Sequence, residues 1–205
     1  MKKITPYKTY RNALASLDNG GRFFDFWSKA DDGDITSAEL RKAAGVFSGM
    51  QKTIIYLEMS LISLDREAKE KVLAHLSGDL QESYSKYKPT CFLPAEASQS
   101  AVIAQSAVIK GIPKLLDSKT EFTGFIMIPI MTGKTTTFTM IPIMDQYDIY
   151  ELRDEESEED FFIAHNRGGR KLPEQAIHCG GVIKELKGRK GEESGKFLET
   201  LYYSL

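Results

Sequence analysis

The sequence predicts an α+β protein, in which a helical bundle over residues 1–90 is followed by a small antiparallel β-barrel or curled sheet over residues 91–205. Two observations predict this division. Residues 4–87 are rich in Ala, Leu, Lys and Glu at helical spacing, whereas the chain from residue 101 onward is rich in Ile, Val, Thr and Phe, with Gly and Pro between the runs. The segment 88–95 carries two prolines and is expected to connect the two parts.

The composition is that of an ordinary globular protein. Of the 205 residues 41% are hydrophobic and 27% are charged, which excludes a disordered, collagen-like or disulfide-dense chain. The 27 basic and 29 acidic residues give a formal net charge of -2, so any contact with nucleic acid must come from a local basic patch. Two cysteines, and a sequence without a signal-peptide or membrane-span pattern, predict a cytoplasmic protein.

In the N-terminal part we expect one long helix from Thr36 to about Leu64. Thr36 and Glu39 have the spacing of a capping box, in which each residue satisfies a backbone N–H of the other. The apolar residues behind them recur at alternating spacings of three and four, which places them on one stripe: Leu40, Ala43, Phe47, Met50, Ile54, Leu57, Leu61 and Leu64. Further apolar residues widen this stripe, which favours a bundle within one chain over a coiled-coil dimer. Another helix is expected to open at Asp65.

The segments 125–131 and 138–144 are nearly identical, and they predict a β-hairpin whose turn lies at 132–137. The expected register opposes Ile128 to Ile141 and Ile126 to Ile143 on one face. The other face would then carry prolines and the candidate hydrophobic interface, which consists of Phe125, Met127, Met131, Phe138, Met140 and Met144. Because both faces are apolar, we expect one in the core and the other covered by the helices, a second subunit or a ligand.

Further strands are expected near 107–116, 147–152, 161–165, 176–185 and 197–203. Short turns join them, which is typical of a small antiparallel barrel. The succession of segments 150–154, 161–164 and 172–184 resembles the later strands of OB-like barrels, and this resemblance covers less than half of the chain. It implies a module that could bind single-stranded nucleic acid.

Residues 20–48 resemble a degenerate EF-hand, the helix–loop–helix unit that binds calcium. With Gly33 at the sharp turn of the loop, Asp32 takes the fifth place and Glu39 the twelfth, and Asp34 lies between them. The first and third places hold no carboxylate. We therefore expect a turn that caps the following helix, with no metal bound tightly.

Two basic loops are candidates for binding an anion or a nucleic acid. The first contains Arg167, Arg170 and Lys171 beside glycines, and the second contains Lys187, Arg189 and Lys190. The alternative is that both are solvated turns. The acidic run 154–160 would repel a nucleic-acid strand that passes nearby.

The sequence assigns no catalytic residue, metal centre or cofactor. The adjacent His178 and Cys179 would point to opposite faces of a strand, so we expect Cys179 to be a buried structural residue. The hypothesis that follows is a non-enzymatic interaction or adaptor protein that docks a protein partner, with a homo-oligomer left open. The alternative is an OB-like module that binds single-stranded nucleic acid through the basic loops.

Overall fold

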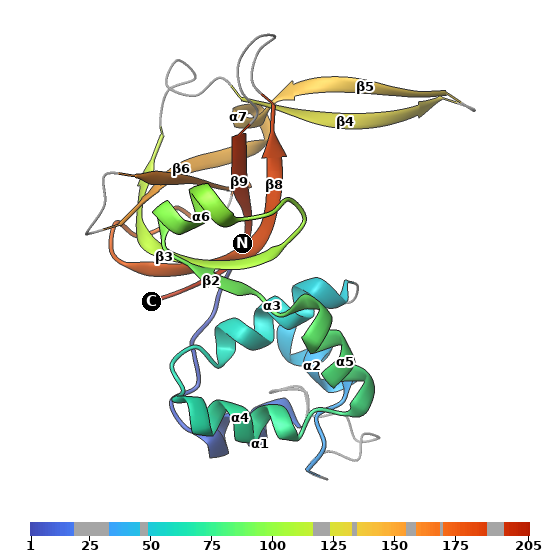
Figure 1. The fold of residues 1–205 in the computed structure, drawn as a ribbon, viewed down its shortest axis with the longest axis vertical. Helices are drawn as coiled ribbons and strands as arrows, with labels where there is room; N and C mark the ends of the chain where they lie inside the picture. Colours follow the sequence, from blue (N-terminus) through green and yellow to red (C-terminus); the bar gives the residue numbers. More distant parts are fainter. Residues whose placement is uncertain are drawn as a thin grey trace. The chain divides into compact units, whose positions relative to one another are not determined.

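The computed structural model shows a mixed α+β protein (Figure 1). By its internal contacts the chain forms two compact units, which we call the helical unit (residues 2–90 and 202–205) and the β unit (Met1 and residues 91–201). The expected division into two domains, 1–90 and 91–205, stays a prediction. The structure describes residues 1–18, 33–45, 49–116, 124–132, 135–154, 159–168, 170–187 and 195–205, and for 126–132 and 135–138 it describes the backbone. Within these ranges no helix is long and apolar enough to cross a membrane.

The helical unit contains five of the described helices: α1 (Tyr10–Leu17), α2 (Ser37–Ala44), α3 (Met50–Ser60), α4 (Arg66–Ala74) and α5 (Gly78–Tyr87). The expectation of one continuous helix from Thr36 to Leu64 is wrong, because α2 ends at Gly45. This glycine has φ +68° and forms a left-handed C-cap, a conformation that favours glycine over residues with a Cβ. The short strand β1 (Lys2–Lys3) pairs in parallel with Tyr202 and Tyr203 at the chain's other end.

The predicted helix starts are confirmed. Thr36 and Glu39 form both hydrogen bonds of the capping box at α2, and the Asp65 side chain accepts from the backbone N–H of Ala68 at the start of α4. Every residue from Thr53 to Leu61 is buried, so α3 is enclosed on all sides from Thr53 onward. This burial explains why apolar residues occupy more than one stripe of α3.

A buried carboxylate ties three helices of the helical unit together. Glu58 on α3 is 3% exposed. Its two oxygens are both used, since one forms an ion pair with Lys69 on α4 and the other accepts a 2.8 Å hydrogen bond from Tyr84 on α5. A buried charge needs such partners to offset the loss of hydration, so Glu58 fixes how α3, α4 and α5 pack.

Besides β1, the seven-stranded sheet contains six strands that lie mostly in the β unit: β2 (Thr90–Phe92), β3 (Ser106–Leu115), β6 (Tyr147–Arg153), β7 (Asp160–Asn166), β8 (Ile177–Leu186) and β9 (Gly195–Ser204). The five later strand positions predicted from sequence are confirmed. Among the described strands, β3, β6, β7, β9 and β8 each pair with the next, and β8 pairs with β3 again. We call these five strands the strand ring. The helix α6 (Pro94–Ser100) precedes β3 and packs on β7 and β3.

The expectation of a purely antiparallel sheet is wrong. β3 runs antiparallel to β6 and β8, and β6 runs antiparallel to β7, but β7 and β9 are parallel. The reason is geometric, because directions cannot alternate all the way around a closed ring with an odd number of strands. One parallel pair is therefore unavoidable among the five strands described.

Two glycines let the strands of the ring approach closely. A Cβ on Gly181 of β8 would lie 2.1 Å from the Glu199 carbonyl oxygen of β9. A Cβ on Gly111 of β3 would lie 2.6 Å from the Arg153 carbonyl oxygen of β6. Both contacts are far inside van der Waals distance, so the ring closes in this form because neither position carries a side chain.

The core of the ring is formed by residues that oppose one another across the ladders. Ile109 opposes Cys179, and Tyr150 opposes Ile163, which in turn opposes Leu198 of β9. All five are at most 1% exposed. The prediction that Cys179 is a buried residue is thereby confirmed, and burial raises the pKa of its thiol well above the ordinary range.

The predicted hairpin forms a separate two-stranded sheet of β4 (Phe125–Thr132) and β5 (Thr135–Pro142), which we call the ribbon. Its register differs from the expected one, since Ile126 opposes Ile141 and Ile128 opposes Thr139. Both strands continue through Thr132 and Thr135, which the sequence places in the turn, and the pairing is therefore moved by two residues. A shift of two preserves the faces, so Phe125, Met127, Pro129 and Met131 still share a face with Phe138, Met140 and Pro142.

Candidate functional site

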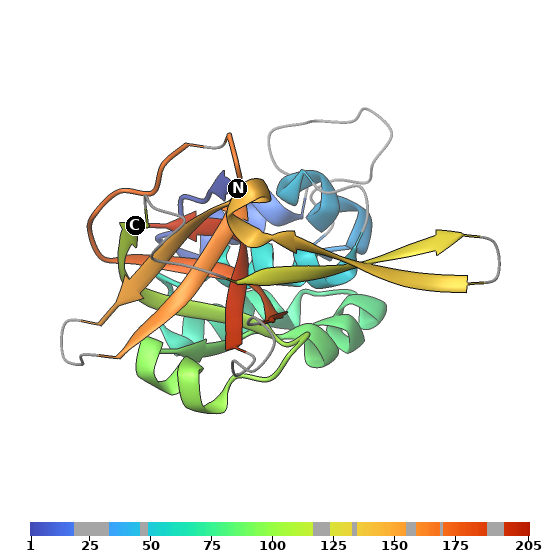
Figure 2. The same cartoon turned by 90° about the horizontal axis from the view of Figure 1, so that it is seen from above.

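The ribbon extends away from the strand ring of the β unit, as two perpendicular views show (Figures 1 and 2). It lies in the connection between β3 and β6. Met140 of β5 is 50% exposed, and it opposes Met127 on the face that carries Met, Phe and Pro residues. Met140 is therefore a half-exposed apolar side chain on this face of the ribbon.

The base of the ribbon is fixed to the ring. Phe125 and Lys187 exchange two backbone hydrogen bonds of 2.9 and 3.1 Å, and the Ile143 N–H donates to the Gly124 carbonyl over 3.0 Å. The predicted extension of the hairpin to Met144 is wrong, because Pro142 ends β5 and the short helix α7 (Ile143–Gln146) follows. Met144 is 5% exposed and packs in an apolar cluster with Ile143, so it belongs to the core and not to the exposed face.

The first basic loop is exposed. Arg167 Nε lies 3.7 Å from Asp148 Oδ1 of β6, and the side chains of Arg170 and Lys171 are open to solvent. In the second loop, Lys187 forms an ion pair with Glu185 two residues before it. Arg189 and Lys190 lie outside the described residues. The structure thus joins Lys187 to the foot of the ribbon, a neighbour that the sequence did not suggest.

The outward face of β6 and β7 carries more acid than base. Arg153 donates to Glu151 over 2.9 Å, and its Nε lies 3.5 Å from Asp160 of β7. Two carboxylates thus neutralise one guanidinium. Phe162 opposes Glu151 on the same face and is only partly buried.

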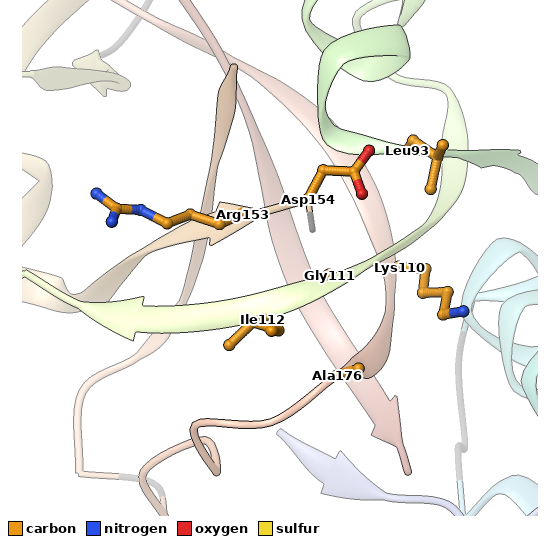
Figure 3. Close-up of a pocket in the computed structure, with 7 residues that line it drawn as sticks. All are labelled: Leu93, Lys110, Gly111, Ile112, Arg153, Asp154 and Ala176. Atoms are coloured by element: carbon orange, nitrogen blue, oxygen red, sulfur yellow. The ribbon is translucent and has the colours of Figure 1, made fainter. Parts of the chain in front are cut away.

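A pocket of about 200 Å³ lies on the outer side of the ring, where β3 changes its pairing partner. β3 pairs with β8 up to Gly111 and with β6 from Ile112 onward. Figure 3 shows the carboxylate of Asp154 directed towards Leu93, whereas the Arg153 side chain extends away on the other side. The lining residues are Leu93, Lys110, Gly111, Ile112, Arg153, Asp154 and Ala176.

Sequence reasoning missed this pocket, although one signal was present. Lys110 and Gly111 interrupt an apolar strand that runs from Ala107 to Ile112. An isolated glycine in a strand indicates a close approach of another backbone, and the alternation of a strand places Lys110 opposite to its buried neighbour Ile109. The remaining lining residues come from distant segments, which no local pattern could bring together.

The structure gives the acidic residues of the EF-hand-like segment different surroundings. Glu39 is 6% exposed, and its Oε2 accepts hydrogen bonds from the Thr36 backbone N–H (2.9 Å) and hydroxyl (2.7 Å). Asp34 is exposed, and Asp32 lies outside the described residues. The carboxylate that would be the bidentate calcium ligand is thus engaged in capping α2.

No cluster of three or more His, Cys, Asp or Glu side chains with metal-binding geometry occurs among the residues that the structure describes. His178 and Cys179 are successive residues of β8, and the thiol is fully buried. No protein-family model matches this sequence, and no curated protein matches it at a significant level of similarity.

Proposed function

We propose that this protein is a non-enzymatic interaction protein in which an OB-like strand ring presents the ribbon to a protein partner. The observation that carries the proposal is the ribbon itself, which stands away from the ring with Met140 half exposed on its Met, Phe and Pro face. A two-stranded ribbon is only marginally stable in water, so a partner that covers one face would stabilise it.

The strand pairing supports the OB-like part of the proposal. An OB-fold is a five-stranded Greek-key barrel that binds its ligands on strands two and three and on the loops after strands one and four. In the ring these loops would be the connection between β3 and β6, which holds the ribbon, and the connection between β8 and β9, which begins at Lys187. The ribbon would then occupy a place where such folds bind their ligands.

The chemistry of the ribbon favours a protein over a nucleic acid. Its exposed methionine is apolar and adaptable, as in surfaces that bind protein segments. Pro129 and Pro142 lack a backbone N–H, which disfavours the addition of another strand at the edge and favours docking on the face. The outward face of β6 and β7, with Glu151 and Asp160 around Arg153, would repel phosphates.

A photo-crosslinking experiment tests this proposal. A benzophenone amino acid is placed at position 140 of the full chain, and in a matched variant at Ile103, which is 49% exposed against 50% for Met140 and lies in the same unit. Illumination in the native cell should yield a discrete protein adduct from position 140 and not from 103. Adducts that are equal at both positions, or absent at 140, would contradict docking by the ribbon.

Binding of single-stranded nucleic acid is the second candidate function. It is favoured by the exposure of Arg167, Arg170 and Lys171 in the loop after β7. An anisotropy titration with labelled oligonucleotides at rising salt tests it directly. Micromolar binding that weakens steeply with salt and is lost in the triple Gln variant of these residues would favour this function over the first.

A further inference from the structure

The pocket at the partner change of β3 combines one available cation with an apolar wall. Lys110 lines it and is exposed, and among the described residues none forms an ion pair with this ammonium. Arg153, the other cation in the lining, is held by Glu151 and Asp160. Lys110 is therefore the positive group that a ligand can engage.

The local charge around Lys110 is not compensated on the neighbouring strand. His178 of β8 lies directly opposite Lys110, so both residues are on the same outward face. Burial lowers the pKa of His178, and the positive charge of Lys110 lowers it further. An anion bound at Lys110 would reduce this repulsion, which makes His178 a reporter for the site.

The rest of the lining determines the shape and orientation of a ligand. Leu93 is 39% exposed, and together with Ile112 and Ala176 it provides an aliphatic wall. Figure 3 shows the Asp154 carboxylate directed towards Leu93 and apart from the Lys110 ammonium, so the carboxylate of a ligand is placed at Lys110. The volume of about 200 Å³ is below the usual range for drug-sized ligands, so a short body fits.

We propose that this pocket binds a carboxylate with a short branched aliphatic body, the carboxylate at Lys110 and the body against Leu93, Ile112 and Ala176. Two sources share this chemistry, namely the last residue of a protein chain and a free short-chain acid. The pocket lies on the ring and not on the ribbon. Experiments can therefore refute ligand binding at the pocket without refuting the proposal that the ribbon docks a protein.

Nuclear magnetic resonance titration of the full chain tests the site with three defined probes. These are 3-methylbutanoate, an acetylated tetrapeptide that ends in a leucine carboxylate, and the same peptide as its C-terminal amide. We expect millimolar binding of at least one acid, with amide shifts centred on Gly111, Ile112 and Ala176 and a raised pKa of His178. The amide peptide should bind at least tenfold more weakly. Tighter binding of the acid peptide identifies a chain end as the ligand, and tighter binding of 3-methylbutanoate identifies a free acid.

Lys110→Gln should weaken the binding of the acid at least tenfold and remove the shift of His178. The matched control is Lys114→Gln, an exposed lysine on the same strand and face that does not line the pocket, and it should bind as the wild type does. The proposal is overturned if neither acid produces shifts at the pocket, if the amide peptide binds as well as the acid, or if the two lysine variants behave alike.

Discussion

Closure of the strand ring at Gly181 predicts that Gly181→Ala is severely destabilising. An added Cβ would lie 2.1 Å from the Glu199 carbonyl oxygen, 2.9 Å from its carbonyl carbon and 3.1 Å from Leu198 Cγ. Carbon and oxygen that are not bonded approach to about 3.3 Å at closest, so β8 and β9 would have to separate by roughly 1 Å. The obstacle is backbone on a paired strand, which cannot rotate aside as a side chain would.

The cost follows from two contributions. Overpacking in a well-packed interior costs about 1–3 kcal/mol. The separation of β8 from β9 would also weaken about two ladder hydrogen bonds, each worth about 1 kcal/mol. We therefore expect Gly181→Ala to lower the free energy of unfolding by about 3–5 kcal/mol, a large part of the 5–15 kcal/mol that holds a typical protein folded.

Urea unfolding followed by far-ultraviolet circular dichroism measures this loss. The matched control is Gly78→Ala at the start of α5, where an added Cβ meets nothing within 4 Å and the helix favours alanine by up to about 1 kcal/mol. Gly111→Ala, with its nearest obstacle at 2.6 Å, should be destabilised less than Gly181→Ala. If Gly181→Ala unfolds within about 1 kcal/mol of the wild type, the ring does not close as described.

Three further predictions concern charged and titrating groups. Glu58→Gln should lower the free energy of unfolding by about 2 kcal/mol in urea titration, because Lys69 loses its buried counter-charge, whereas an unchanged midpoint would show that the ion pair is not needed. In the folded chain the pKa of His178 is lowered from 6.5, so as pH falls the unfolded chain binds a proton at this residue before the folded chain does. The free energy of unfolding should therefore be highest above pH 6.5 and should decrease as pH falls from 6.5 through the lower pKa of the folded chain. His178→Gln should flatten the pH dependence of the urea midpoint in that window, and an unaltered profile would refute this assignment. Millimolar calcium should leave the melting temperature unchanged, since Glu39 already caps α2; a rise of many degrees that Glu39→Gln abolishes would show a calcium site.

Local patterns were sufficient for the positions of most described elements. The capping box at Thr36 and the N-cap at Asp65 could be recognised because their partners lie three residues away. The strands of the ring were found from apolar runs bounded by turn residues. The break at Gly45 was missed because a glycine can weaken a helix or end it, and tertiary context decides which.

Long-range pairing could not be predicted in the same way. The hairpin register depends on how far Thr132 and Thr135 extend the strands, and the parallel pairing of β7 with β9 depends on closure of the ring. The pocket was missed because Leu93, Lys110 and Asp154 meet only through the pairing of strands far apart in sequence. By contrast, the apolar character of the ribbon was evident from composition alone.

The claim that the ribbon docks a protein is tested most directly by calorimetry with the purified partner that crosslinks to position 140. Burying a methionine contributes about 1.5–3 kcal/mol, and Met140 has half of its surface left to bury, while a carboxylate in its place would be desolvated without a partner. We expect Met140→Asp to raise the dissociation constant at least tenfold, and Met140→Leu and Ile103→Asp to change it by less than about twofold. Equal affinities for Met140→Asp and the wild type would contradict the account.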